Sequence, residues 1–285
     1  MARRAKFKPY NGDSVYLKKF SNVLTALTDR KSAATVFADF LKIAAISISN
    51  TFDPNGKCTP LEIREERENI YLQLAKEYDK DFQLFLDMFA ALKLELNIAK
   101  QAEYRDVLGQ ILTSMQINDE SNDKFFTPTH IAEWMGELCC RIKDFANEIK
   151  QFGYCVLKEP TCGGGALVFG GVEAFRRQGF NPEQQLVAIA TDMDERCVMM
   201  TYIQCAMYKI PAMVQQRNFM EDKSLSPPWF TPMFVFYNWK EIMIQNEPLW
   251  ASNKNTPPVV EERPPKKPKE NIPAVKEELG QTSLF

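Results

Sequence analysis

Residues 154–165 read Tyr-Cys-Val-Leu-Lys-Glu-Pro-Thr-Cys-Gly-Gly-Gly, an apolar strand that runs directly into a glycine turn. After the turn, Leu167, Val168, Val172 and Phe175 recur with helical spacing, so the glycines are expected between a strand and a helix. Glycine suits this position because a side chain would block both the tight turn and the approach of a ligand to the start of the helix.

Two further strands are predicted after this turn. Residues 186–191 are apolar and lead to Asp192, where a doubly wound sheet places a carboxylate that accepts hydrogen bonds from ribose hydroxyls. An amphipathic helix over 198–206 and a strand that begins at Ala212 and leads to Asn218 come next. This order of elements predicts a parallel α/β sheet with a nucleotide-type cofactor site.

The same residues resemble motifs of the N6-adenine DNA methylase family, in particular the modification subunits of type I restriction systems and their solitary relatives. Four stretches match in order, over roughly residues 100–220. Phe125-Phe126-Thr127-Pro128 resembles the family's Phe/Tyr-Thr-Pro element. Residues 159–165 resemble its Asp-Pro-x-Cys-Gly-x-Gly turn, with Glu159 in place of Asp. Asp192-Met193 resembles its acidic-apolar pair, and Asn218-Phe219 the next loop.

The resemblance implies S-adenosyl-L-methionine as the cofactor. Its methionine part would lie at the glycine turn, its ribose at Asp192 and its adenine at Met193 and Asn218. The cofactor-binding residues implied in this way are Phe126, Thr127, Pro128, Glu159, Pro160, Cys162, Gly163, Gly165, Asp192, Met193 and Asn218.

Four of these residues also have simpler explanations. Thr127 and Pro128 fit a helix cap followed by a first-turn proline. Cys162 fits a small residue that fills a tight turn, and Met193 fits a core position. The helix after Pro128 is expected to bury an apolar face made of Ile131, Trp134, Met135 and Leu138.

The motif for the target base departs from the family pattern. Family members carry Asn-Pro-Pro-Tyr/Phe, and the nearest match here is Ser226-Pro227-Pro228-Trp229, similar to the Ser-Pro-Pro-Tyr/Trp variant of amino methyltransferases. A base amine is a poor nucleophile, so the enzyme must accept hydrogen bonds from it in the transition state. Ser226 and the Pro227 carbonyl, fixed by Pro228, would be those acceptors, and Trp229 would stack on a flipped base. A proline-rich surface turn explains the same residues.

Composition limits the class of protein. The chain has 285 residues, 45% of them hydrophobic, and a formal charge of -2, enough for a full core and two domains plus a tail. Its most apolar stretch, 33–49, contains Asp39 and Lys42, so we expect no membrane span. Seven cysteines without a C-x-x-C pair indicate reduced thiols. A single histidine, His130, argues against zinc sites and histidine-dependent triads. We expect a cytoplasmic protein without a metal.

Four segments are predicted along the chain. Residues 1–122 form an all-α helical bundle, and residues 123–245 form a Rossmann-like, S-adenosylmethionine-dependent methyltransferase domain with fewer strands than a complete methylase sheet. Residues 246–280 are a disordered linker rich in Pro, Lys and Glu. Residues 281–285 are a candidate partner-binding peptide.

That terminal peptide is Gln281-Thr282-Ser283-Leu284-Phe285. Gln281, Leu284 and Phe285 resemble the short motif by which bacterial proteins dock on the DNA polymerase sliding clamp. Leucine and phenylalanine would fill an apolar pocket while glutamine fixes the register. Docking on a clamp that encircles DNA would offset the weak attraction of an acidic protein for DNA. An incidental apolar terminus is the simpler explanation.

Together these features predict a DNA methyltransferase that acts on a base amine, with adenine N6 as the leading target. A catalytically inactive, S-adenosylmethionine-binding module that associates with DNA or docks on the clamp stays open because the sheet is short. A dinucleotide oxidoreductase fits less well, because Pro-Thr-Cys-Gly-Gly-Gly departs from the G-x-G-x-x-G pattern.

Overall fold

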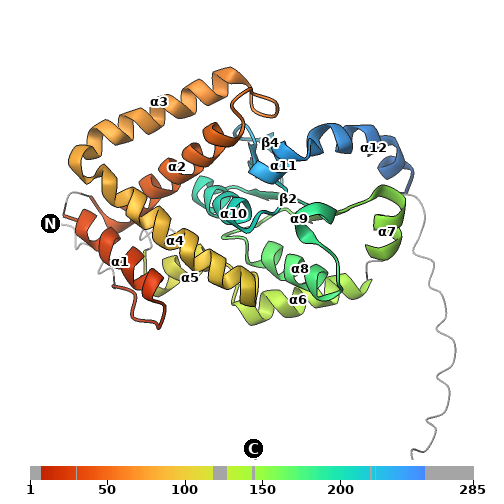
Figure 1. Cartoon of the computed structure of the whole chain (residues 1–285), viewed down its shortest axis with the longest axis horizontal. Helices are drawn as coiled ribbons and strands as arrows, with labels where there is room; N and C mark the ends of the chain where they lie inside the picture. The colour runs from red at the N-terminus through yellow and green to blue at the C-terminus, as the bar shows by residue number, and fades with distance from the viewer. Residues whose placement is uncertain are drawn as a thin grey trace, which may run out of the picture. The chain divides into compact units, whose positions relative to one another are not determined.

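The structure is a computed structural model that describes residues 8–29, 31–117, 127–142, 145–218, 220–221 and 223–253 (Figure 1). It has a mixed α/β fold with many helices and a small sheet. Residues 1–246 cluster as one compact unit and residues 247–285 as a second.

The N-terminal part is helical, as the sequence predicts. Its elements are α1 (Val15–Leu27), α2 (Ala33–Phe52), α3 (Leu61–Tyr78), the short η1 (Asp79–Asp81), α4 (Phe82–Ala102) and α5 (Val107–Ser114). Side-chain caps define three of the starts. Ser14 Oγ accepts from Leu17 N at 3.1 Å, Ser32 Oγ accepts from Thr35 N at 3.1 Å, and Asp106 Oδ1 accepts from Gly109 N at 2.8 Å.

The α/β part follows the predicted order. It contains α6 (Thr129–Ile142), α7 (Phe145–Phe152), β1 (Cys155–Glu159), α8 (Ala166–Arg177), α9 (Pro182–Gln185), β2 (Leu186–Asp192), α10 (Glu195–Tyr208) and β3 (Ala212–Asn218). Then come β4 (Lys223–Ser224), β5 (Trp229–Phe230), α11 (Pro232–Phe236) and α12 (Trp239–Asn253).

The sheet has the order β1-β2-β3-β4, with β5 also paired to β3. Strands β1, β2 and β3 are parallel, with Cys155 opposite Leu186 and Ala188 opposite Ala212. Strands β4 and β5 run antiparallel to β3. The predicted parallel unit is confirmed, and the carboxyl ends of its three strands lie at one edge of the sheet.

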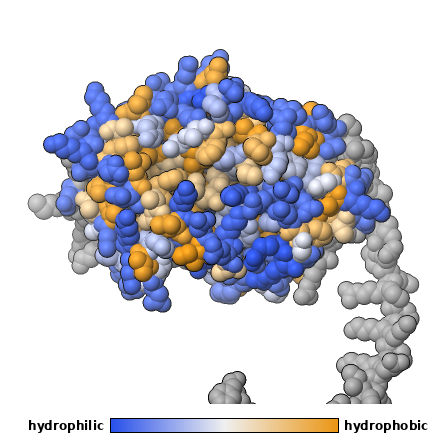
Figure 2. Space-filling view, in the orientation of Figure 1, coloured by the Kyte–Doolittle hydropathy of each residue, from blue (hydrophilic) through white to orange (hydrophobic). Residues whose placement is uncertain are grey.

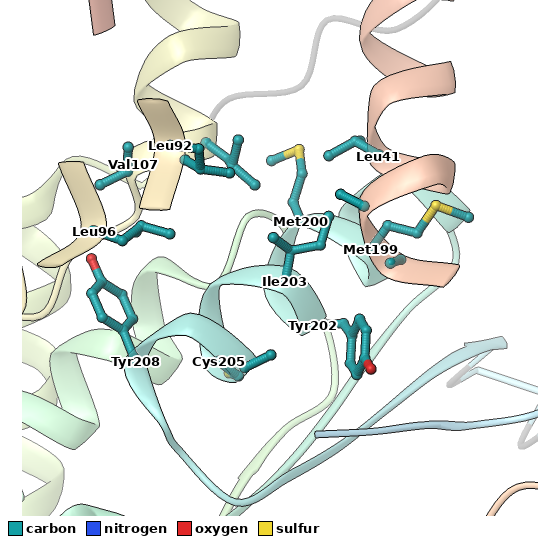
Figure 3. Packing of buried hydrophobic residues seen from close by; sticks show 14 of the residues in the cluster. Leu41, Leu92, Leu96, Val107, Met199, Met200, Tyr202, Ile203, Cys205 and Tyr208 are labelled. Carbon is teal, nitrogen blue, oxygen red and sulfur yellow. The ribbon is translucent and has the colours of Figure 1, made fainter. Parts of the chain in front are cut away.

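Helix α10 joins the helical and α/β parts. It packs against α2, α4 and α5 on one side and against β2 and β3 on the other (Figure 1). Met200 and Ile203 lie between Leu41 of α2 and Leu92 of α4, as Figure 3 shows. A helix that is apolar nearly all round is a buried helix. The two predicted domains therefore share one continuous core.

Helix α6 packs differently from the prediction. Its expected buried face is exposed, including Trp134 at 63%. The contact with α8 is made by small residues instead, because a Cβ on Gly136 would lie 2.3 Å from the carbonyl oxygen of Gly170. Large side chains cannot enter so close an approach, so they point elsewhere. All four residues of the predicted face are exposed: Ile131, Trp134, Met135 and Leu138.

Hydrophilic residues cover much of the face seen in Figure 2, with hydrophobic residues in separate patches among them. Within the described part of the chain, α2 alone is long and apolar enough to cross a membrane by length and composition. Most of its length is buried inside the protein, as expected of a core helix.

Candidate cofactor site at the carboxyl ends of the parallel strands

The turn between β1 and α8 is held to the end of β2. Cys162 N donates to Thr191 O at 2.8 Å, and Thr191 Oγ1 donates to Pro160 O at 2.9 Å. Gly163 and Gly165 have φ values of 53° and 101°, the left-handed region that favours glycine. At Gly165 a Cβ would also lie 2.6 Å from the Phe169 ring. The turn thus requires the glycines that the sequence singled out.

Helix α10 supports the same turn from behind. Thr201 Oγ1 donates to Gly163 O at 3.0 Å, and Gln204 Nε2 donates to Gly164 O at 2.8 Å. These two hydrogen bonds fix the carbonyl groups of Gly163 and Gly164 against α10. Backbone N–H groups at the start of a helix attract anionic ligand groups, so the turn presents an anion-binding end at α8.

Asp192 lies at the carboxyl end of β2 and contacts the turn directly. Its Oδ2 accepts from Gly163 N at 2.9 Å, and its Oδ1 accepts from Asp194 N at 2.9 Å. A carboxylate oxygen can accept more than one hydrogen bond, so both oxygens of Asp192 can also accept from ligand hydroxyls. The structure therefore brings Asp192 and the glycine turn together, as predicted.

Met193 and Asn218 lie at the same edge of the sheet. Met193 is 59% exposed, so the alternative of a core methionine is wrong. Its carbonyl accepts from Gln216 Nε2 at 2.9 Å, which ties the end of β2 to β3. Asn218 ends β3, and its Oδ1 accepts from Met220 N at 3.1 Å. Both residues remain candidates for adenine contacts.

Other predicted residues have local structural roles. Glu159 Oε1 accepts from Thr161 N at 3.0 Å at the end of β1. Cys162 is buried, and burial raises the pKa of its thiol well above the ordinary value, so it stays neutral. It fits the small residue that a tight turn needs.

Thr127 and Pro128 immediately precede α6. The Pro128 carbonyl accepts the first α-helical hydrogen bond, from Ala132 N at 3.0 Å, so Pro128 is the cap residue and the helix begins at Thr129. Gln110 Nε2 of α5 donates to Thr129 Oγ1 at 3.0 Å and holds this end of α6. Phe126 lies outside the described residues, as do Phe219 and the candidate docking residues Gln281, Leu284 and Phe285.

A cavity of about 260 Å³ borders β1 near the turn. Its lining includes Met135 and Cys139 of α6, Leu157 and Glu159 of β1, and Leu167 of α8. The part of the chain that the structure describes contains no cluster of His, Cys, Asp and Glu able to hold a metal ion.

The predicted target-base segment leads into β5, which pairs with β3 on the side of the sheet away from β1. Its residues are Ser226, Pro227, Pro228 and Trp229. Val214 of β3 pairs with Trp229 of β5, so β2 and β3 separate this segment from β1. Three strand spacings amount to about 14 Å. Ser226 lies near the carboxyl end of β3, where its carbonyl accepts from Gln215 Nε2 at 3.0 Å, whereas Trp229 is three strands away from β1.

Trp229 is also occupied by other contacts. It is 6% exposed, and the Arg67 guanidinium of α3 lies 3.5 Å from the centroid of its ring. Tyr202 lies 5.3 Å away, centroid to centroid. Arg67 Nη2 donates to Pro228 O at 3.1 Å, and burial lowers the pKa of Arg67 to about 10. A ring enclosed in this way cannot stack on a base, so the prediction for Trp229 is wrong.

Sequence reasoning missed Asp106 and Gln204. Both contact the glycine turn although they belong to other elements: Gln204 Nε2 donates to Asp106 Oδ1 at 2.9 Å and to Gly164 O at 2.8 Å. In the sequence, Asp106 stands directly before the apolar residues of α5. This position predicts a helix cap and gives no indication of a contact with the turn.

The site is thus a glycine turn and a carboxylate at the carboxyl ends of parallel strands in a mixed α/β fold. No protein-family model matches the sequence, and no curated protein matches it. Among solved structures, the chain is similar to the methyltransferase subunit of a type I restriction-modification system from Streptococcus thermophilus, with 13% identity and a TM-score of 0.32. The match covers 74% of this chain and 58% of that one, and similarity at this level carries no functional argument.

Proposed function

We propose that the chain binds S-adenosylmethionine at the glycine turn and Asp192 and transfers its methyl group to a base amine of DNA, with adenine N6 as the target. The observation that carries the proposal is the bond from Gly163 N to Asp192 Oδ2, which fixes a helix N-terminus beside a carboxylate at the sheet edge. Such an edge is where open parallel sheets bind nucleotide-type ligands.

Each part of the cofactor has a matching group. The N–H groups at the start of α8 suit the methionine carboxylate. Asp192 suits the ribose hydroxyls, and the exposed Met193 side chain offers an apolar cover for adenine. Asn218 would reach the adenine edge, and Phe126 and Thr127 would complete the site from the α6 side.

The amine acceptors are a separate requirement. Because Trp229 is enclosed and pairs with β3, the groups that accept hydrogen bonds from the base amine are proposed to come from elsewhere. The residues that the structure describes place no Asn-Pro-Pro-type motif next to β1.

The test is transfer of labelled methyl from S-adenosylmethionine to unmethylated DNA by the purified full chain, followed by nucleoside identification. We expect N6-methyladenine. Asp192→Ala should abolish transfer and weaken cofactor binding at least tenfold, whereas Asp29→Asn, an exposed aspartate away from the site, should do neither. Labelled N4-methylcytosine would overturn the adenine assignment, and undiminished binding by Asp192→Ala would overturn the assigned pocket.

A non-catalytic S-adenosylmethionine-binding module is the second candidate. The displaced Ser226–Trp229 segment favours it, because the enclosed Trp229 cannot take part in base binding. This function predicts cofactor binding without methyl transfer.

The second candidate function also predicts that an immobilised bacterial sliding clamp retains the chain in a pull-down. This retention should be lost when Gln281 to Phe285 are removed. Equal recovery with and without the peptide would exclude clamp docking.

A further inference from the structure

Asp106 is a nearly buried carboxylate outside the predicted site. It caps α5, and its Oδ1 accepts from Gly109 N at 2.8 Å and from Gln204 Nε2 at 2.9 Å. Gln204 Oε1 in turn accepts from Val107 N at 2.7 Å. Asp106 is 5% exposed, so this network fixes the carboxylate in one position.

The second oxygen of Asp106 is directed at the glycine turn. A Cβ on Gly164 would lie 2.1 Å from Oδ2, and a Cβ on Gly109 would lie 2.0 Å from it. Both glycines therefore make room for this oxygen. Among the described residues Oδ2 accepts no hydrogen bond, and Asp106 forms no ion pair. Because Asp106 is 5% exposed, a donor or a cation that reaches Oδ2 would lower the free energy of its carboxylate.

Two carboxylates thus flank consecutive residues of the turn. Asp192 accepts from Gly163 N, and Asp106 lies against Gly164. In S-adenosylmethionine the sulfonium joins the ribose to the methionine chain, and the ammonium and carboxylate lie on the third carbon from the sulfur. A site that holds the ribose at Asp192 can therefore place the amino-acid part along the turn.

We propose that Asp106 Oδ2 accepts a hydrogen bond from the α-ammonium group of the bound cofactor. This inference rests on the proposed function and adds a recognition residue from the helical part of the chain. The ammonium supplies the cation that Oδ2 lacks, while the cofactor carboxylate meets the N–H groups of α8. Asp106 would then select adenosine ligands that carry an amino acid.

The competing explanation is that Asp106 serves the fold alone, as a cap and a link between α5 and α10. A structural role would affect every ligand of the turn equally. An ammonium contact would affect only ligands that carry the ammonium, so two closely matched ligands separate the explanations.

The experiment measures binding of S-adenosylhomocysteine and of its analogue with hydrogen in place of the α-ammonium, by calorimetry on the full chain. We expect the wild type to prefer S-adenosylhomocysteine by about 10- to 100-fold, the range of a charge-assisted hydrogen bond. Asp106→Asn should remove this preference and bind the analogue within about twofold of the wild type. Asp106→Ser, which keeps an oxygen for the cap, should behave in the same way if the asparagine variant folds poorly.

Asp29→Asn makes the same charge change at an exposed position and should keep the preference. Equal weakening of both ligands in Asp106→Asn would overturn the ammonium contact and leave the cofactor site intact. A retained preference would overturn it as well. If the wild type binds neither ligand, the proposed function itself fails, and the inference fails with it.

Discussion

At the residue scale, Asp106 ties ligand recognition to stability. Burial raises the pKa of its carboxyl, so the folded protein holds this proton more tightly than the unfolded chain does. The free energy of unfolding should therefore fall as pH rises from the ordinary aspartate pKa, about 4, through the raised value. Without a bound ligand, the ionised Asp106 carboxylate therefore lowers the free energy of unfolding.

The Asp106→Asn variant tests this effect. Without ligand at neutral pH, it should be roughly 1 kcal/mol more stable than the wild type, because the substitution removes the cost of burying a charge. The fall in stability above about pH 4 should also be smaller in the variant. Urea unfolding of both proteins across this pH range provides the measurement. Parallel stability curves would contradict the expected effect of the Asp106 charge.

A second residue with a stability effect is Trp229. The sequence predicts that it stacks on the target base, whereas the structure encloses it under Arg67. Trp229→Ala should lower the free energy of unfolding by about 3–5 kcal/mol, because it leaves a cavity under the Arg67 guanidinium. Trp134→Ala, at an exposed tryptophan, should change it by less than about 0.5 kcal/mol. Urea unfolding compares the two. Similar effects of both substitutions would contradict the enclosed position of Trp229.

Sequence reasoning found some residues of the site and missed others for a physical reason. Gly163, Gly165 and Asp192 could be predicted because chain order alone places them: the two glycines lie in the turn that follows β1, and Asp192 is the last residue of β2. Asp106 and Gln204 could not, because their contact depends on how α5 docks on α10. Nothing in the local sequence of either residue encodes that docking.

At the element scale, the contact between α6 and α8 depends on the absence of side chains. Alanine normally favours a helix over glycine by up to about 1 kcal/mol. At Gly136, however, the added Cβ would lie 2.3 Å from the Gly170 carbonyl oxygen. We expect Gly136→Ala to destabilise the protein by about 1–3 kcal/mol, the cost of overpacking. Leu138→Ala, on the exposed side of α6, should have little effect.

Thermal unfolding of the two variants checks this expectation, and a Gly136→Ala protein at least as stable as the wild type would refute the close approach.

The same contact explains why the buried face of α6 was predicted wrongly. Apolar periodicity identifies large residues, whereas this interface uses Ala132, Gly136, Gly170 and Gly171. Strands β4 and β5 were missed because two-residue strands carry no alternation to detect.

At the scale of the whole molecule, the shared core limits how the chain can be divided. Removal of the N-terminal helices would expose the side of α10 that carries Met200 and Ile203 (Figure 3). It would also remove Asp106 from the turn. A chain limited to residues 123–246 should therefore fail to fold cooperatively, although the sequence predicts a domain there.

Circular dichroism and calorimetry on this fragment and on residues 1–246 provide the comparison. Residues 1–246 should unfold in a single transition, because α10 belongs to the cores of both parts. A fragment 123–246 with its own sharp transition would show that the α/β part is autonomous after all.

The central position of α10 also has a consequence for synthesis of the chain. The helices that cover it, α2 and α4, end at Phe52 and Ala102, whereas α10 ends at Tyr208. At roughly 5–20 residues per second, a ribosome needs about 5–20 s from the end of α4, and about 8–30 s from the end of α2, to complete α10. During that interval the nascent helices carry an uncovered apolar surface, a natural substrate for chaperones that meet the growing chain at the ribosome.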